Sequence, residues 1–510
     1  MAAIELFQDV MPVEVGLVSL QLVDPPTLEK DGMQATLRLV IWEPPKDGSG
    51  EKSIRDIKEQ QCIVLPAAWF GDPRLPLYWK AWARHVVEKL KGDVEWLLPH
   101  ELFPAQRLHP LKREELTTED AIVEALAAAG SAERRPLVPA PKAIASHPEL
   151  EAAIAENPDD LARWQVYADF LQERGDPRGE LVALEIKAAS GDLEAAAAAG
   201  RLFGKHEDLF AGPMADYDEQ LTLGWKMGFV ESARMGLTYE DHESGISGVD
   251  LVRTLLTHPS ALFLRSLTLG TFNFEGDNDY SQMLEALFER PRPALRSVFV
   301  GDTQPDEQEI SWTRAGDLSR LSEVARNLKK LKVRAGSMTL GALDLPKLEE
   351  LVLETGGLSK ASFQAVSDAH WPSLERLELW FGSDNYGAEC RAEDLADLLG
   401  GVRLPKLKKL GLRNAEFTDA LMPALASSKL LAQVEELDLS MGILTDRGAE
   451  TIVANAACFA HLKRLIVDRC FLSGDALARL ARLGLELSAG RQQTADEYDG
   501  QTHYYVAVGE

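Results

Sequence analysis

The C-terminal half of the chain repeats one spacing of apolar residues. In each copy an apolar residue is followed three positions later by a second and then two positions later by a third, as in Leu348, Leu351 and Leu353. The second and third residues lie two positions apart, so they point to the same face of a short strand. The spacing predicts one strand per copy, and the copies begin at Leu264, Leu295, Leu328, Leu348, Leu374, Leu407, Val434 and Leu462, with a weaker copy at Leu480.

Helix-like stretches, such as 394–399 and 448–453, lie between the predicted strands. The eight strong copies begin 20 to 33 residues apart, and leucine-rich repeats are about 20–29 residues long. A single strand with its helix cannot bury its own apolar side, but stacked copies share a continuous core. The predicted fold class is therefore α/β. We expect a leucine-rich-repeat solenoid with a parallel concave sheet over 250–490 and a C-terminal tail with a terminal strand over 491–510. A generic α/β protein would not explain eight copies of one template.

The template also assigns residues to the concave face of the predicted sheet. If the leucines point inward, the side chains between and beside them line that face, and basic and acidic copies alternate along the stack. Opposite charges on neighbouring strands would stabilise the sheet, which is a sufficient explanation for any single charge. For the surface as a whole we expect a docking site for another protein. Trp380 is the best anchor, since exposed aromatic residues and arginines dominate interface energetics.

Two segments interrupt the repeats, one over 302–317 and one over 381–387. Insertions in a solenoid often carry binding residues, although Trp312 and Tyr386 could equally hold their own loops to the core. The candidate partner-binding residues are Arg334, Trp312, Arg376, Glu378, Trp380, Tyr386, Arg413 and Asp438.

A small, mainly helical module is predicted over 147–249. Pro148 opens a first helix, which ends at Asn157 and Pro158. A second helix over 161–174 has apolar residues at helical spacing, and a third helix runs over 178–189. The carboxylates of Asp169, Glu173 and Glu180 could form a cluster, but the nearby arginines favour local pairing.

Several runs in these two regions resemble known families. Residues 260–510 resemble a bacterial leucine-rich-repeat family of unassigned function, on the runs 310–312, 316–317, 384–387, 437–442, 444–446 and 505–508. Residues from about 146 to 235 resemble the bacterial repeat-companion domain, on the runs 167–171, 173–180, 228–231 and Trp225. The resemblances imply a fold and a module that accompanies tandem repeats, and neither implies an activity.

Residues 1–130 are expected to form an α+β domain of unknown type, joined to the rest by a linker over 131–146. Alternating apolar residues predict strands over 13–18, 35–42 and 60–65, and an amphipathic pattern predicts a helix over 77–90. The run Gly48–Ser53 has Glu51 where a phosphate-binding loop needs glycine, so we expect a hairpin turn there.

Composition and the lack of known motifs disfavour several classes of partner and activity. The 510-residue chain has 54 Lys and Arg against 81 Asp and Glu, a formal charge of −27, which disfavours nucleic acid and anionic membranes as partners. The four cysteines are scattered, the N-terminus lacks a basic signal region, and no apolar run is long enough to span a membrane, so a cytoplasmic location is expected. Neither metal-ligand spacing nor a nucleophile or nucleotide motif is evident. We therefore expect no cofactor, no metal and no enzymatic activity.

The leading hypothesis is a cytoplasmic scaffold or adaptor that binds a partner protein through the concave face. One alternative is a regulatory protein with an enzymatic or metal-dependent module in 1–130. Another is a sensor or inhibitor in a bacterial conflict or defence system, which rests on analogy alone.

Overall fold

The computed structural model describes residues 145–510, except for 240, 242–245, 275, 306 and 510, together with five strands between residues 4 and 65. The chain divides into two compact units, Met1–Leu137 and Val138–Glu510. Each unit is described by itself.

The first unit contains an antiparallel sheet of β1 (Ile4–Val13), β2 (Gly16–Leu22), β3 (Thr27–Glu29), β4 (Gly32–Glu43) and β5 (Ser53–Leu65). The single strand predicted over 13–18 is wrong, because Val13 pairs with Gly16 across an antiparallel ladder and the chain reverses between them. The strands predicted over 35–42 and 60–65 lie inside β4 and β5. The helix predicted over 77–90 and the linker up to residue 144 lie outside the described residues.

The second unit begins with five helices, and the first three of them are the helices expected from the sequence. The five are α4 (Pro148–Glu156), α5 (Leu161–Gln172), α6 (Pro177–Ala189), α7 (Leu193–Lys205) and α8 (Glu207–Phe210), followed by the 3-10 helix η5 (Gly212–Tyr217). An aspartate caps the start of α5, α6 and α7, namely Asp160, Asp176 and Asp192. Each carboxylate accepts hydrogen bonds from backbone N–H groups that the first helical turn leaves unpaired. Proline occupies the first turn of α4 and α6, where its missing N–H costs nothing.

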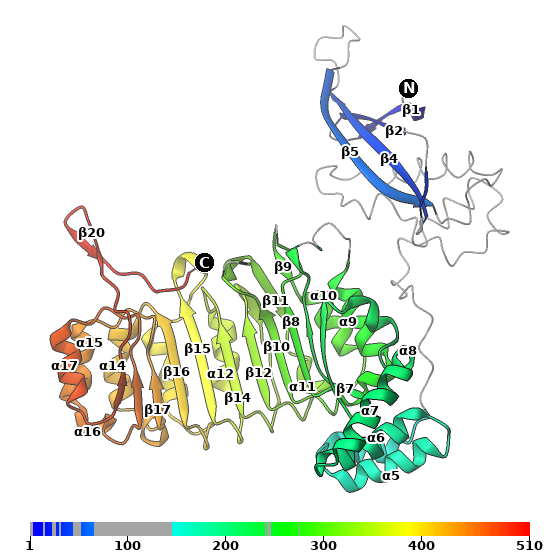
Figure 1. Ribbon diagram of the computed structural model, residues 1–510. Coiled ribbons are helices and arrows are strands. Elements are labelled where there is room, and N and C mark those ends of the chain that lie inside the picture. Colours follow the sequence, from blue (N-terminus) through cyan, green and yellow to red (C-terminus); the bar gives the residue numbers. More distant parts are fainter. Residues whose placement is uncertain are drawn as a thin grey trace. The chain divides into compact units, whose positions relative to one another are not determined.

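An eleven-stranded sheet forms the body of the second unit (Figure 1). The antiparallel hairpin of β6 and β7 opens the sheet, and every later strand pairs in parallel with its neighbour. The strands in spatial order are β6 (Leu221–Lys226), β7 (Phe229–Met235), β8 (Ser266–Gly270), β10 (Ser297–Asp302), β12 (Lys330–Arg334), β14 (Glu350–Glu354), β15 (Arg376–Gly382), β16 (Lys409–Ala415), β17 (Glu436–Asp438), β18 (Arg464–Ile466) and β19 (Glu486–Ser488).

This mixed α/β arrangement is a leucine-rich-repeat-like solenoid, as the sequence predicts. The leucines of each copy align in register from strand to strand, for example Leu351 with Leu377 and Leu377 with Leu410. The weak final copy is displaced from its predicted place, because Leu465 pairs with Leu487 and not with Leu483. Leu480 belongs to the preceding helix α17 (Gly474–Ala481), so the spacing of leucines there reflects a helix and a turn.

Helices cover one face of the sheet (Figure 1). The leucine spine packs between the sheet and these helices, and its members are almost all fully buried. Each leucine side chain buried in this way stabilises the fold by about 1.5–3 kcal/mol. The covering helices are α9 (Gly248–Thr257), α10 (Ser281–Phe288), α11 (Leu321–Val324), α12 (Lys360–Asp368), α13 (Ala396–Leu399), α14 (Thr418–Ala426), α15 (Asp446–Ala454), α16 (Ala456–Phe459) and α17.

A buried arginine joins the helical module to the repeats. The Arg178 side chain is 1% exposed, and its Nη2 donates to the carbonyl of Leu209 and to Ser260 Oγ, both at 2.9 Å. Ser260 Oγ in turn donates to the carbonyl of Phe210 at 2.7 Å, and Arg178 pairs with Asp176 at 3.4 Å. Because β6 and β7 follow the helices in the chain and belong to the eleven-stranded sheet, the module and the repeats share one continuous structure.

The C-terminal residues run back across the ends of the strands. A hairpin of β20 (Asp496–Tyr498) and β21 (Gln501–His503) comes first. The segment 504–509, here called the strap, follows the hairpin. The Ala507 N–H donates to the carbonyl of Met441 at 3.0 Å, and the Asn414 amide exchanges two hydrogen bonds with the backbone of Val508. The strap therefore spans several repeats.

A paired-charge surface on the open sheet face

The sheet face opposite the helices, here called the open face, carries one row of residues in register across ten strands. The register joins Ser232, Ser266, Ser297, Lys330, Glu350, Arg376, Lys409, Glu436, Arg464 and Glu486. Three serines begin the row, and charges of both signs fill the rest. Opposite charges on adjacent strands form ion pairs, such as Lys409 with Glu436 at 3.5 Å and Arg376 with Glu350 at 2.9 Å. The alternation of charge seen in the sequence thus stabilises strand pairing.

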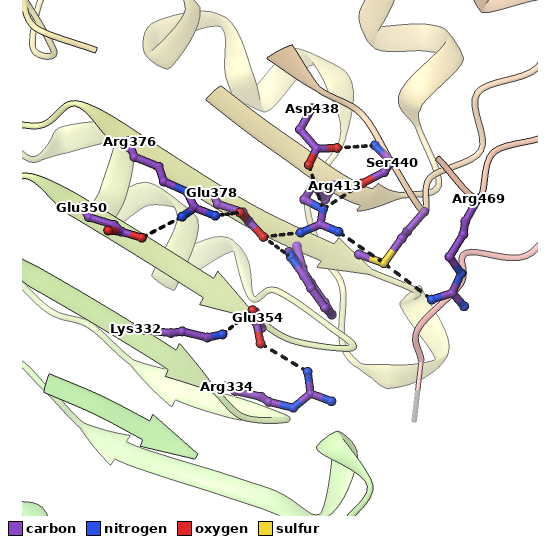
Figure 2. A network of polar contacts seen from close by, with 12 residues as sticks. Lys332, Arg334, Glu350, Glu354, Arg376, Glu378, Arg413, Asp438, Ser440 and Arg469 are labelled. Atoms are coloured by element: carbon purple, nitrogen blue, oxygen red, sulfur yellow. Dashed lines mark hydrogen bonds and ion pairs between the residues drawn. The ribbon is translucent and has the colours of Figure 1, made fainter. Parts of the chain in front are cut away.

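Glu378 lies at the centre of the open face and binds three donors. Arg376 donates to its Oε2 at 2.7 Å, while Trp380 Nε1 and Arg413 Nη1 donate to its Oε1 at 2.8 and 2.5 Å (Figure 2). Burial by itself would raise the pKa of Glu378, but the charge of Arg413 and these hydrogen bonds outweigh it and hold the pKa below its usual range. Glu378 is therefore a buried, ionised hub for two arginines.

Trp380 lies within this surface and does not project from it. Only 7% of the residue is exposed, so the expectation of an exposed aromatic anchor is wrong. The guanidinium carbons of Arg413 and Arg334 stand 5.0 and 5.9 Å from its ring centre, within the range of cation–π contact. The indole is buried because arginines from two other strands cover it, and it supports their side chains.

Arg413 connects three strands. It contacts Glu378 on β15, and its Nε pairs with Asp438 at the end of β17 at 3.3 Å and donates to Ser440 Oγ just after β17 at 2.9 Å (Figure 2). Burial raises the pKa of Asp438 against the opposing charge of Arg413. On the other side of Trp380, Glu354 pairs with Lys332 at 2.9 Å and with Arg334 at 3.2 Å.

Six of the eight predicted partner-binding residues meet on the open face, namely Arg334, Arg376, Glu378, Trp380, Arg413 and Asp438. The other two lie in the insertions. Trp312 ends the 3-10 helix η8 (Ile310–Trp312) and is 48% exposed, whereas Tyr386 ends η9 (Asp384–Tyr386) and packs against Gly509 of the strap.

The repeat template did not assign three further members of the network, Ser440, Met441 and Arg469, to the concave face. Ser440 binds Arg413, and Met441 Sδ lies 3.8 Å from Arg413 and 3.9 Å from Arg469. Each comes one or two positions after the last apolar residue of its copy, Leu439 or Val467. A template that included these two positions would have predicted them.

A cavity of about 630 Å³ lies where the turn between α4 and α5 meets the starts of β7, β8, β10 and β12. Asp159 on that turn pairs with Lys226 and Arg265, and Arg296 donates to the carbonyls of Ala155 and Glu156. The polar groups that line the cavity thus hold the helical module against the edge of the sheet.

In the described part of the chain, no three His, Cys, Asp or Glu side chains gather around a possible metal position. Nor does any helix of those residues have the length and apolarity that a bilayer crossing demands.

The chain is similar in part to several proteins of known structure. No protein-family model matches the chain, and no curated protein matches it. A Bacteroides fragilis protein of known structure is 26% identical, covers 62% of this chain and 86% of its own, and has a TM-score of 0.47. The structure of the TLR13–ssRNA13 complex is 15% identical over 52% of this chain and 37% of its own, with a TM-score of 0.30. A Listeria monocytogenes internalin is 14% identical over 49% of this chain and 71% of its own, with a TM-score of 0.21. At such low TM-scores none of these likenesses carries an argument about this chain.

Proposed function

We propose that the protein is a cytoplasmic, non-enzymatic scaffold or adaptor that binds a partner protein through the open face of its repeats. The observation that supports this most is the network around Glu378 and Trp380, in which side chains from five consecutive strands, β12 and β14 to β17, fix one another in place. A surface whose arginines are already ordered loses less conformational entropy on binding than a mobile one. Arginine is also enriched among the residues that dominate interface energies.

The buried position of Trp380 changes its proposed role. With little of its ring exposed, it contributes by holding Arg334 and Arg413 at the surface and not by entering a pocket of the partner. Replacing it with alanine would remove the platform and release both arginines.

Capture of partners from the native cell tests this proposal. The full chain serves as bait, and mass spectrometry compares the wild type with Trp380→Ala, Arg376→Glu and the matched control Arg447→Glu. Arg447 is exposed on α15, on the helix side of the solenoid, so its reversal changes the net charge equally. We expect a protein that the wild type and Arg447→Glu retain and that both open-face variants lose. Equal recovery on all four baits would exclude the open face as the binding site.

The alternative of an enzymatic or metal-dependent module in 1–130 concerns side chains outside those described and stays a prediction.

A further inference from the structure

On the open face, most basic side chains of the row are more exposed to solvent than the acidic side chains that pair with them. The Lys330 side chain is 60% exposed and that of its partner Glu350 26%. The corresponding values are 54% and 27% for Lys409 and Glu436, and 38% and 10% for Lys332 and Glu354. The last pair of the row, Arg464 with Glu486 on the terminal strand, reverses the order.

The greater exposure of the basic side chains follows from their length. Lysine and arginine lay their apolar stems along the surface and carry the charge at the far end, whereas a carboxylate stays close to the backbone. On a single row of a sheet, the carboxylates therefore form the floor and the cations form the top. A protein that approaches this face meets mainly positive charge, although the whole chain carries a formal charge of −27.

We infer that the partner presents an acidic, extended protein segment to the open face, an inference that rests on the proposed function. The cations of the row occur on β12, on the adjacent strands β15 and β16, and on β18, with an acidic strand between these groups. Strands lie about 4.8 Å apart, so β12 and β18 lie about 24 Å apart with the pair β15 and β16 midway between them. The three groups therefore recur about 12 Å apart, which an extended chain covers in about three to four residues. A segment that crosses the strands with carboxylates alternately three and four residues apart would match them.

A protein segment fits these observations better than a nucleic acid does. The acidic strands interrupt the cations, so a continuous line of phosphates would meet carboxylates at regular intervals. The strongly negative chain would also repel a polyanion at long range, whereas a few spaced carboxylates on a protein experience less of that repulsion.

Binding of synthetic peptides to the full chain tests the inference. A fluorescent peptide of about twelve residues with glutamates alternately three and four positions apart is titrated with the protein and followed by anisotropy. Analogues with glutamine or lysine at those positions, and a single-stranded oligonucleotide, are compared with it. The variant Lys330→Gln/Lys409→Gln/Arg464→Gln removes exposed cations and leaves the network around Glu378 intact. The control Lys429→Gln/Arg447→Gln/Arg482→Gln removes the same charge from exposed residues elsewhere.

We expect the glutamate peptide to bind. The open-face variant should weaken its binding about tenfold, because three exposed ion pairs are lost. The control should change binding less than about twofold. Preferential binding of the lysine peptide or the oligonucleotide, or equal loss in both variants, would overturn the inference. A captured partner that depends on Trp380 and Arg376 but binds through a basic segment would also refute it, while leaving the proposed function standing.

Discussion

At the scale of single residues, burial decides what each charged group does. Glu378 is buried and stays ionised because Arg376, Arg413 and Trp380 all donate to it. Asp438 is also buried, and the N–H and hydroxyl of Ser440 and one arginine bind it, but burial together with the charge of Glu378 moves its pKa upward. The two carboxylates differ in that two arginines bind Glu378 and one binds Asp438, so the positive charge around a buried carboxylate decides the direction of its pKa shift.

His258 is expected to make the stability of the second unit depend on pH. Its ring is buried, its Nδ1 accepts a hydrogen bond from the Ser260 N–H at 3.2 Å, and burial together with the charge of Arg178 lowers its pKa to about 4. The unfolded chain takes up this proton below about pH 6.5, so stability falls as the pH decreases from about 6.5 to about 4, by up to about 3 kcal/mol.

Chemical denaturation of the wild type and of His258→Asn across this pH range measures the effect. Asparagine can accept the same hydrogen bond and does not titrate, so its stability should change less between pH 6.5 and 4. Identical pH profiles for the two proteins would show that His258 is not responsible.

At the scale of elements, the strap depends on a backbone feature shared by successive repeats. Asn414, Met441 and Arg469 each come two positions after the last strand leucine or valine of their repeat and each has a positive φ, of 54°, 68° and 55°. The same three residues contact the strap, through the amide of Asn414, the carbonyl of Met441 and the guanidinium of Arg469. The left-handed turns thus present polar groups to the returning chain.

Substitution of Asn414 is expected to release the strap. Asn414→Ala removes both hydrogen bonds to Val508 and puts alanine at a positive φ, at a cost of about 2–4 kcal/mol. Asn414→Gly removes the same hydrogen bonds without the backbone penalty. In hydrogen exchange, both variants should lose protection at Ala507 and Val508, and both should unfold at a lower denaturant concentration than the wild type, the alanine variant at the lower of the two. Retained protection in the glycine variant would show that packing, not the amide, holds the strap.

The sequence predicts some of these elements and not others, for physical reasons. The spine was predictable because two leucines per copy lie two positions apart, which is a local pattern. The contact between Asn414 and Val508 joins residues 94 positions apart and leaves no periodic trace. The burial of Trp380 was missed because Arg334 and Arg413, which cover it, come from strands that only the stacking of repeats brings together. The final strand was misplaced because Leu480 of α17 and Leu483 and Leu485 after it imitate the strand spacing.

At the scale of the whole second unit, we expect a destabilising substitution to affect mainly the repeats near it. Repeats contact their neighbours only, so damage at one end need not reach the other. Arg178→Ala would leave Asp176, Ser260 and the Leu209 carbonyl without their buried partner, at a cost of about 3–5 kcal/mol. Hydrogen exchange should then speed up in α4–α6 and β6–β8, while β16–β18 stay protected.

The complementary variant is Leu465→Ala in β18, at the opposite end of the leucine spine. It should lower the free energy of unfolding by about 2–5 kcal/mol. It should expose β17–β19 and α15–α17 and leave α4–α6 unchanged. Uniform loss of protection in either variant would mean that the unit unfolds as a single cooperative block.

The row on the open face has unlike ends, since hydroxyls occupy its first three strands and ions the following seven. A linear ligand lying across it would therefore meet a different sequence of groups when turned around. Such a surface can distinguish the amino-to-carboxyl direction of a bound chain, so a peptide and its reversed sequence should not bind alike.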